Sequence, residues 1–329
     1  MKHVSILVPA GKCILSSVVG AYKVFNSVNG YLMQTGQEDK MFKVDLVGIS
    51  DETVLYDGCF QIKPNKRIEE VDKTDLIIVT TIQGDMDVEL NLNRPFVKWM
   101  QNQRIENNAE LASLCGGAFL LADSGLLNGK TATTHWIIQE EFKNRFPEVE
   151  LTGEKIITED NGIYTSGGAY SFLNLLLHLV EKHAGREAAI WCSKLLEIEF
   201  DRDSQNEFII FSGQKGHGDE VILKAQEIIE GNIHDKINVE SLADKLALSG
   251  RSFIRRFKKA TSNTPLEYIQ RVKIEAAKKQ LESTTKNIGE VMYQVGYSDT
   301  KAFRNTFRKY TGMSPIEYRG KYNREMAMI

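Results

Sequence analysis

The segment SFIRRFKKATSNTPLEY, residues 252–268, returns fifty positions later as AFRNTFRKYTGMSPIEY, residues 302–318. Both copies carry two phenylalanines four residues apart, then a basic run, and both end in Pro-X-Glu-Tyr. A repeat at this distance is typical of a duplicated supersecondary unit. In each copy the phenylalanines and the basic residues fall on opposite faces of a helix, so each copy predicts an amphipathic helix with a basic face.

A short apolar helix and a turn precede each basic helix. Residues 239–246 are followed by the turn Leu-Ser-Gly at 248–250, and residues 288–295 by Gly-Tyr-Ser at 296–298. Helix, tight turn and basic helix is the helix-turn-helix pattern, whose second helix enters the major groove. The sequence therefore predicts an all-α domain with two recognition helices for double-stranded DNA.

The faces of these helices indicate which side chains meet DNA. With Phe253 and Phe257 turned toward the core, and Phe303 and Phe307 likewise, the opposite faces are outward. The residues expected there are Arg251, Arg255, Lys258, Thr300, Lys301, Arg304, Asn305 and Arg308. Arginine pairs with guanine and asparagine with adenine, so base contacts are expected from Arg251, Arg255 and Asn305. The remaining residues are expected to contact phosphate, the commoner role of basic side chains on DNA.

Charge divides the chain in the same place. Residues 220–329 hold 20 Lys and Arg against 13 Asp and Glu, and the preceding residues hold 21 against 31. The net charges are +7 and −10, within a chain total of −3. This asymmetry predicts a basic nucleic-acid module joined to an acidic domain with another role. Three glycines within 212–219 predict the linker, which leaves a first domain at 1–211 and a second at 220–329.

Strand and helix patterns alternate through the first domain. Apolar runs at 3–9, 42–50, 75–81 and 110–114 predict strands, and the patterns at 14–29, 94–107 and 118–124 predict helices. Such alternation predicts an α/β fold, with a parallel sheet covered by helices on both faces.

Cysteine and histidine spacing suggests no disulfide framework and no metal site. The four cysteines lie far apart without a CxxC pair, and the six histidines form no ligand cluster. No apolar stretch approaches the roughly 20 residues of a membrane span, so a cytoplasmic protein is expected.

Cys115 lies where a predicted strand turns sharply into a helix, directly before Gly116 and Gly117. This is the geometry of a nucleophile elbow, and a helix N-terminus is expected to lower the pKa of the thiol. His135 follows in Thr-Thr-His-Trp and is expected at the same edge of the sheet. A Cys–His pair is the minimum for thiol catalysis. The alternative is a ligand pocket lined by an unreactive thiol and a hydrogen-bonded histidine.

The stretch SLCGGAFLLADSGLLNGKTATTHW, residues 113–136, resembles the sensor domain of AraC/XylS-type transcriptional regulators. In that group the sensor is similar to the ThiJ/PfpI and class I glutamine amidotransferase superfamily. YTSGGA at 164–169 and the C-terminal repeat fit the same family, so the resemblance covers nearly the whole chain. It implies a flavodoxin-like sensor domain, a homodimer, and a seven-helix domain with two helix-turn-helix units.

One departure from the family bears on catalysis. Catalytic members carry a carboxylate in the loop after the first strand, whereas this chain has KCILSS at 12–17. Nothing there would tune Cys115 or orient His135, so both are expected to be vestigial, with no enzyme activity, cofactor or metal.

The predicted function is therefore a sequence-specific DNA-binding transcriptional regulator that responds to a small-molecule effector. The effector is expected in a pocket formed by Ser16, Gly84, Cys115, Gly116, Gly117 and His135. The alternative is a thiol-dependent amidase or peptidase, or a glyoxalase-like enzyme, tethered to DNA.

Overall fold

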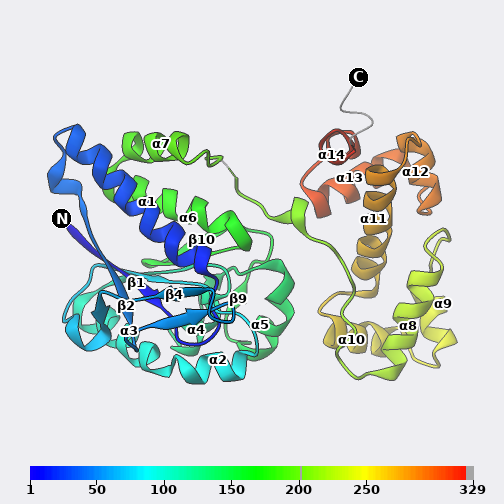
Figure 1. Cartoon of the computed structure of the whole chain (residues 1–329). Coiled ribbons are helices and arrows are strands. Elements are labelled where there is room, and N and C mark those ends of the chain that lie inside the picture. The colour runs from blue at the N-terminus through cyan, green and yellow to red at the C-terminus, as the bar shows by residue number, and fades with distance from the viewer. Residues whose placement is uncertain (201, 324–329) are drawn as a thin grey trace. The chain divides into compact units, whose positions relative to one another are not determined.

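The structure is a computed structural model that describes residues 1–200 and 202–323 (Figure 1). It divides into two compact units, Met1–Gln205 and Asn206–Ile329. In the part of the chain that is described, no helix is both long and apolar enough to cross a membrane.

A seven-stranded sheet forms the centre of the first unit, in the order β10-β11-β7-β6-β1-β2-β5. All neighbouring strands are parallel except β10 and β11, which form an antiparallel pair at one edge. The strands are β1 (Lys2–Val8), β2 (Phe42–Gly48), β5 (Lys66–Arg67), β6 (Leu76–Val79), β7 (Glu110–Ser113), β10 (Ile157–Asp160) and β11 (Ile163–Ser166).

Helices cover both faces of this sheet, as predicted, because alternate residues of its central strands are apolar on both sides. Ile6 of β1 packs with helices α1 (Leu15–Gln34), α6 (Phe172–Ala184) and α7 (Arg186–Leu195). Leu7 packs on the opposite face, with α2 (Met86–Leu92), α3 (Arg94–Asn107), α4 (Gly117–Asp123) and α5 (Gln139–Arg145). Figure 1 shows the two helical layers on either side of the strands.

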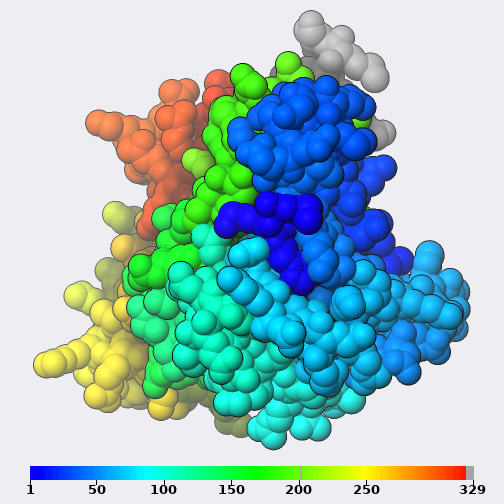
Figure 2. Space-filling view, turned by 90° about the vertical axis from the view of Figure 1, so that its left-hand side faces the viewer, coloured from blue at the N-terminus to red at the C-terminus, as the bar shows by residue number. Residues whose placement is uncertain are grey.

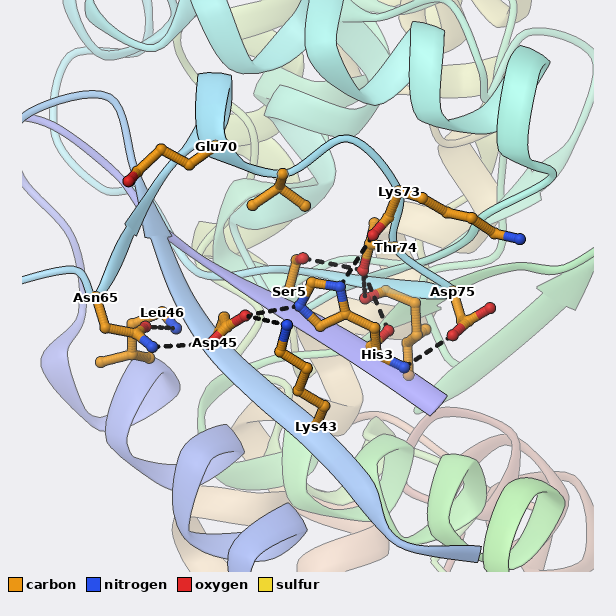
Figure 3. Close-up of polar contacts among 12 residues, drawn as sticks. His3, Ser5, Lys43, Asp45, Leu46, Asn65, Glu70, Lys73, Thr74 and Asp75 are labelled. Carbon is orange, nitrogen blue, oxygen red and sulfur yellow. Dashed lines mark hydrogen bonds and ion pairs between the residues drawn. The ribbon is translucent and has the colours of Figure 1, made fainter. Parts of the chain in front are cut away.

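Polar contacts fix the amino end of β1 between its neighbours (Figure 3). His3 places Nε2 2.8 Å from Asp45 Oδ2 on β2 and Nδ1 3.0 Å from the carbonyl oxygen of Lys73. Its backbone N–H donates to Asp75, at 2.8 Å, just before β6. Burial opposes ionisation of Asp45, but hydrogen bonds from Asn65 and His3 outweigh it and hold the pKa of Asp45 below its ordinary value. The start of the chain, darkest blue in Figure 2, lies at the surface, so the cluster ties the exposed amino end of this central strand to both of its neighbours.

The second unit is helical and repeats itself. Its helices are α8 (Glu220–Gly231), α9 (Val239–Lys245), α10 (Gly250–Thr261), α11 (Pro265–Ser283), α12 (Ile288–Gln294), α13 (Thr300–Thr311) and α14 (Pro315–Tyr322). One core gathers around Phe253 and Phe257 and a second around Phe303 and Phe307, with all four rings fully buried. The pairs α9–α10 and α12–α13 are the two predicted helix-turn-helix units, and α11 joins them.

The residues repeated in the sequence start and anchor equivalent helices. Thr264 and Glu267 form a capping box at the start of α11, and Ser314 and Glu317 form the same box on α14. One turn later, Tyr268 donates its hydroxyl hydrogen to Glu230 at 2.7 Å, and Tyr318 donates to Glu282. The two glutamates lie in the last turns of α8 and α11. Helix α8 therefore holds the tyrosine that follows the first helix-turn-helix pair, as α11 holds the tyrosine that follows the second.

The residues predicted as a linker, 212–219, lie within the helical unit. The division falls between Gln205 and Asn206, and the residues that follow are bound to the helical unit. The ring of Phe211 packs against that of Tyr268, the carbonyl of Gln214 accepts from Gln226 at 2.7 Å, and Asp219 caps α8. Glycines at 213, 216 and 218 suggested flexibility, but the side chains between them make specific contacts that sequence composition does not reveal.

Candidate DNA interface and elbow site

Helix α10 presents a row of exposed cations. The side chain of Ser249 caps its first turn, accepting the N–H of Ser252 at 3.3 Å, and the buried phenylalanines fix which face is outward. Arg251, Arg255 and Lys258 are exposed on that face, as predicted. Ile254 lies among them, and 43% of its surface is exposed. Reasoning from the sequence missed Ile254, because an apolar residue beside Phe253 reads as core.

Helix α13 repeats the arrangement, with Asp299 as its N-cap. Every residue predicted to face DNA on this helix is exposed: Thr300, Lys301, Arg304, Asn305 and Arg308. Among the described residues, none of the six predicted Lys and Arg contacts on the two helices forms a salt bridge. Arg256 differs, because its guanidinium binds Asp219 through both Nε and Nη2. The free cations can therefore approach phosphate or bases without breaking an internal ion pair.

Helix α11 holds the two recognition helices in one body. The side chain of Lys273 is buried and donates to the carbonyls of Asp235, at 2.8 Å, and Gly296, at 3.2 Å. Asp235 lies in the loop between α8 and α9, and Gly296 lies in the turn between α12 and α13. Gly296 has φ +71°, and a Cβ there would lie 2.5 Å from Lys273 Nζ. The same Cβ would lie 2.7 Å from the carbonyl oxygen of His234, so the backbone here favours glycine, and Lys273 ties the two loops to α11.

The turn at Cys115 has the strained backbone of an elbow. Cys115 has φ +52°, which is uncommon for a residue with a side chain. A Cβ on Gly116 would lie 2.4 Å from the carbonyl oxygen of Ile82, and one on Gly117 2.3 Å from that of Val79. Only glycines allow β7 to turn into α4 at this distance from the end of β6, so the predicted elbow geometry is present.

The expected lowering of the Cys115 pKa is wrong. Burial raises the pKa of this thiol, which is 4% exposed, and hydrogen bonds from Ala169 N–H, Gly116 N–H and the Thr81 side chain only partly offset the effect. An elbow predicts a nearby helix N-terminus, but it does not predict how completely the surrounding chain excludes water.

His135 lies at the same site without serving the thiol. Its Nδ1 accepts the backbone N–H of Ile137 at 3.1 Å, which places the ring proton on Nε2. Burial lowers the pKa of His135, so the neutral ring is favoured. In the described structure no hydrogen bond joins His135 to Cys115. The ring packs on Gly168, where a Cβ would lie 2.2 Å from it.

A carboxylate contacts the loop after β1, although it comes from another element and the loop itself contains no acidic residue. Glu89 of α2 is 3% exposed and accepts the N–H of Lys12 at 2.9 Å. Burial raises the pKa of Glu89, and burial together with Glu89 raises the pKa of Cys13 to about 12. The sequence could not show this, because the acid comes from a helix that returns to the loop from a distance.

Two further predicted pocket residues lie near this edge of the sheet. Ser16 is half-buried in the first turn of α1, and Gly84, with φ +106°, lies against Lys12 and Glu89. The backbone N–H of Ile14 donates to the carbonyl of Thr81, and the Thr81 hydroxyl oxygen lies 2.9 Å from the carbonyl oxygen of Leu114, so the ends of β1, β6 and β7 converge. We call Cys115, Gly116, Gly117, His135, Gly168 and Ala169 the elbow site.

Comparison with known proteins agrees with this architecture. Residues 18–182 match the DJ-1/PfpI family, and residues 242–321 match a helix-turn-helix domain. The chain belongs to the DJ-1/PfpI family, and its C-terminal unit is a helix-turn-helix domain of the AraC type. The predicted family and fold class are thereby confirmed.

The proteins that this chain resembles include named transcriptional regulators. The chain is 24% identical over 306 residues to the HTH-type transcriptional regulator GbdR of Pseudomonas aeruginosa, which covers 93% of this chain and 80% of that protein. It is 28% identical over 220 residues to the regulator ArgR of the same organism, 67% of each chain. The fold matches an AraC family transcriptional regulator from Pseudomonas putida with a TM-score of 0.50, at 17% identity, over 60% of this chain and 100% of that one.

Proposed function

We infer that this protein is a sequence-specific DNA-binding transcriptional regulator. The observation that carries the inference is the pair of recognition helices, each with exposed, unpaired cations, held by one buried lysine at a fixed spacing. Two helices fixed in this way can enter successive major grooves on one face of DNA. Selection of duplexes from a random library by the full chain tests this. A recovered motif with two conserved blocks supports it, and binding without sequence preference contradicts it.

Individual side chains have different roles on the recovered site. Arg251, Arg255 and Asn305 contact base edges, and Lys258, Thr300, Lys301, Arg304 and Arg308 contact the backbone. Arg255→Ala therefore relaxes base preference at one position, by about 1–3 kcal/mol, while Lys258→Ala weakens binding to all sequences alike. Equal losses on selected and random duplexes for Arg255→Ala would remove the base-contact assignment.

The N-terminal unit acts as a sensor, with the effector at the elbow site and the adjacent Ser16 and Gly84. It is not an enzyme, because the one imidazole lone pair on His135 is already used by Ile137 N–H and cannot accept a proton from Cys115. Native mass spectrometry of the purified chain tests effector binding.

Turnover of model amides or methylglyoxal tests the alternative, a thiol enzyme tethered to DNA, which the buried carboxylate of Glu89 favours. Activity lost in both Cys115→Ser and His135→Ala would establish it.

The working form is a homodimer assembled through Met1–Gln205. Two chains present four recognition helices, and symmetric dimers are the common way to bind paired half-sites. Sedimentation of the full chain at micromolar concentration measures this directly. A monomer, both free and on DNA, would contradict it.

A further inference from the structure

Gln205 is the last residue of the first unit, and its side chain is buried beside the elbow site. Its side chain is 2% exposed. Its Nε2 donates to the carbonyl of Thr134 at 3.0 Å and to that of Gly153 at 2.8 Å, and its Oε1 accepts the N–H of Gly168 at 3.3 Å. One buried amide therefore holds together segments that are far apart in the sequence.

One of those partners, Gly168, belongs to the elbow site, and another, Thr134, is the direct neighbour of His135. Thr134 precedes His135, and its own hydroxyl donates to the carbonyl of Cys115 at 2.9 Å. Gly168 carries the packed ring of His135 and precedes Ala169, whose N–H faces the Cys115 sulfur. A ligand that displaced either the histidine turn or the Gly168 turn would have to break or shift a hydrogen bond of Gln205.

The backbone of Gln205 and of the residues just before it is also hydrogen-bonded to the first unit. The N–H of Gln205 donates to the carbonyl of Glu154 at 2.9 Å, and that of Ile156 donates to Asp203 at 3.1 Å. Residues 203–205 therefore form the end of the sensor itself.

The next residue already belongs to the DNA-binding unit. Asn206–Phe208 forms a 3-10 turn that packs on α13, and Glu207 pairs with Lys321 of α14 at 2.6 Å. The carbonyl of Ile209 accepts from the buried Lys278 at 2.6 Å, and the N–H of Phe211 donates to Glu275 at 3.1 Å. We call residues 206–219 the strap. It contacts α11, α13 and α14 before it reaches α8, so no slack chain separates it from Gln205.

We propose that Gln205 is a positioning residue that couples the elbow site to the DNA-binding unit through the strap. The coupling rests on the proposed function, since it regulates that same pair of sites. Occupation of the elbow site moves the Gln205 amide, the covalently attached strap moves with it, and the strap braces helices on both sides of α11. Because coupling between two binding sites is reciprocal, DNA must change the affinity of the elbow site for its ligand by the same factor by which that ligand changes the affinity for DNA.

Reciprocity permits a test without a known effector. In a Cys59→Ser background, which removes the exposed thiol, the full chain is treated with iodoacetamide with and without a saturating selected duplex. Peptide mass spectrometry measures the alkylation rate of Cys115. The alkylation rate reports how accessible the buried sulfur is, so a shift of the elbow site by DNA should change this rate clearly. We expect Gln205→Ala to abolish the change while the selected motif is still bound. Gln205→Glu keeps the size of the side chain but removes its donors, and serves if the alanine variant does not fold.

Gln103→Ala is the matched control. Gln103 is also a buried glutamine of the first unit, and it bonds three backbone groups, but they lie at residues 71, 72 and 74 on another part of the sheet. This variant should retain the response to DNA. An alkylation rate that DNA leaves unchanged in the parent, or a response that survives in both Gln205 variants, overturns the coupling. Failure of the parent to select any DNA motif would instead overturn the proposed function.

Discussion

The side chain of Cys115 is subject to two opposing influences. The turn into α4 directs N–H groups toward the sulfur, which favours the thiolate, while burial removes the water that a thiolate needs. Burial has the larger effect, so the pKa of Cys115 lies above the ordinary thiol value. A strained nucleophile position is thus retained around a mostly neutral thiol.

We therefore predict that Cys115 is slow to alkylate at neutral pH. Iodoacetamide should modify the exposed Cys59 first, and the rate at Cys115 should still be rising above pH 9, because only then does its thiolate accumulate. Peptide mass spectrometry over a pH series measures both rates. Faster reaction at Cys115 than at Cys59 at pH 7 would show that the N–H groups dominate after all.

Ile254 supplies an apolar contact on an otherwise cationic helix face. In the major groove the methyl group of thymine is the natural partner of an exposed aliphatic side chain. We predict that replacing one thymine of the selected duplex with uracil, which lacks the methyl group, weakens binding by the parent and leaves Ile254→Ala unaffected. Fluorescence anisotropy measures the affinity for duplexes in which each thymine is replaced in turn, and the duplex with weakened binding identifies the thymine that Ile254 contacts. Lys259→Ala, exposed on the same helix, provides the control, and it should keep the thymine preference.

The lowered pKa of Glu110 makes the free energy of unfolding depend on pH. Burial opposes its ionisation, but hydrogen bonds from His183 and Lys182 outweigh it and lower the pKa of Glu110 to about 2. A carboxyl whose pKa is lower in the folded state stabilises the fold above its unfolded pKa, near 4.5, and loses that contribution as pH falls toward 2.

The difference in free energy of unfolding between parent and Glu110→Gln should therefore shrink between pH 4.5 and 2. Urea unfolding at several pH values measures it. The exposed Glu148→Gln should show no comparable change, and a difference that stays constant over this range would refute the assignment.

At the scale of elements, the sequence predicted the helices and strands whose burial shows in the local pattern of apolar residues. α3 has the predicted bounds, and the strands that became β1, β6 and β7 differ from the predicted ranges only at their ends. The helix was recognised from its periodic apolar face, and the strands from continuous apolar runs, because both faces of these strands are buried. Contacts made across the chain escaped prediction, including the Glu89 carboxylate at the loop after β1, the strap, and the exposed position of Ile254. The first two depend on where a distant segment returns, which local sequence does not encode, whereas Ile254 was missed because an apolar residue next to Phe253 is expected in the core.

The contact of Lys273 across α11 leads to a prediction about the spacing of the recognition helices. Lys273→Leu leaves the carbonyls of Asp235 and Gly296 without their buried donor, which should cost about 1–3 kcal/mol of unfolding free energy. We also expect it to lose more affinity for a duplex with both blocks of the motif than for one with a single block.

Urea unfolding and anisotropy measure the two effects. Lys279→Leu, on an exposed position of the same helix, should change neither. Equal affinity losses on both duplexes would mean that Lys273 stabilises the unit without setting its spacing.

For the whole molecule, the charge division at residue 220 and the structural division after Gln205 do not coincide. The strap is counted with the acidic half by sequence, yet it is bound to the basic half. We predict that a fragment of residues 206–329 melts at a higher temperature than one of residues 220–329, because only the first retains the Phe211–Tyr268 ring contact and the Asp219–Arg256 pair. Thermal unfolding followed by circular dichroism compares them. Phe211→Ala should lower the melting temperature of the longer fragment much of the way to that of the shorter one. Identical melting curves for the two fragments would show that the strap adds no stability.

The position of that division also determines how this protein could be rebuilt. A chimera that joins Asn206 directly to the last buried residue of an unrelated ligand-binding domain would inherit the strap and, with it, a connection to both recognition helices. A chimera joined at Glu220 would carry the same DNA specificity but no mechanical input from its new domain. The two junctions differ by a short stretch of chain, and the proposed coupling predicts that only the first gives a regulator that responds to its new domain.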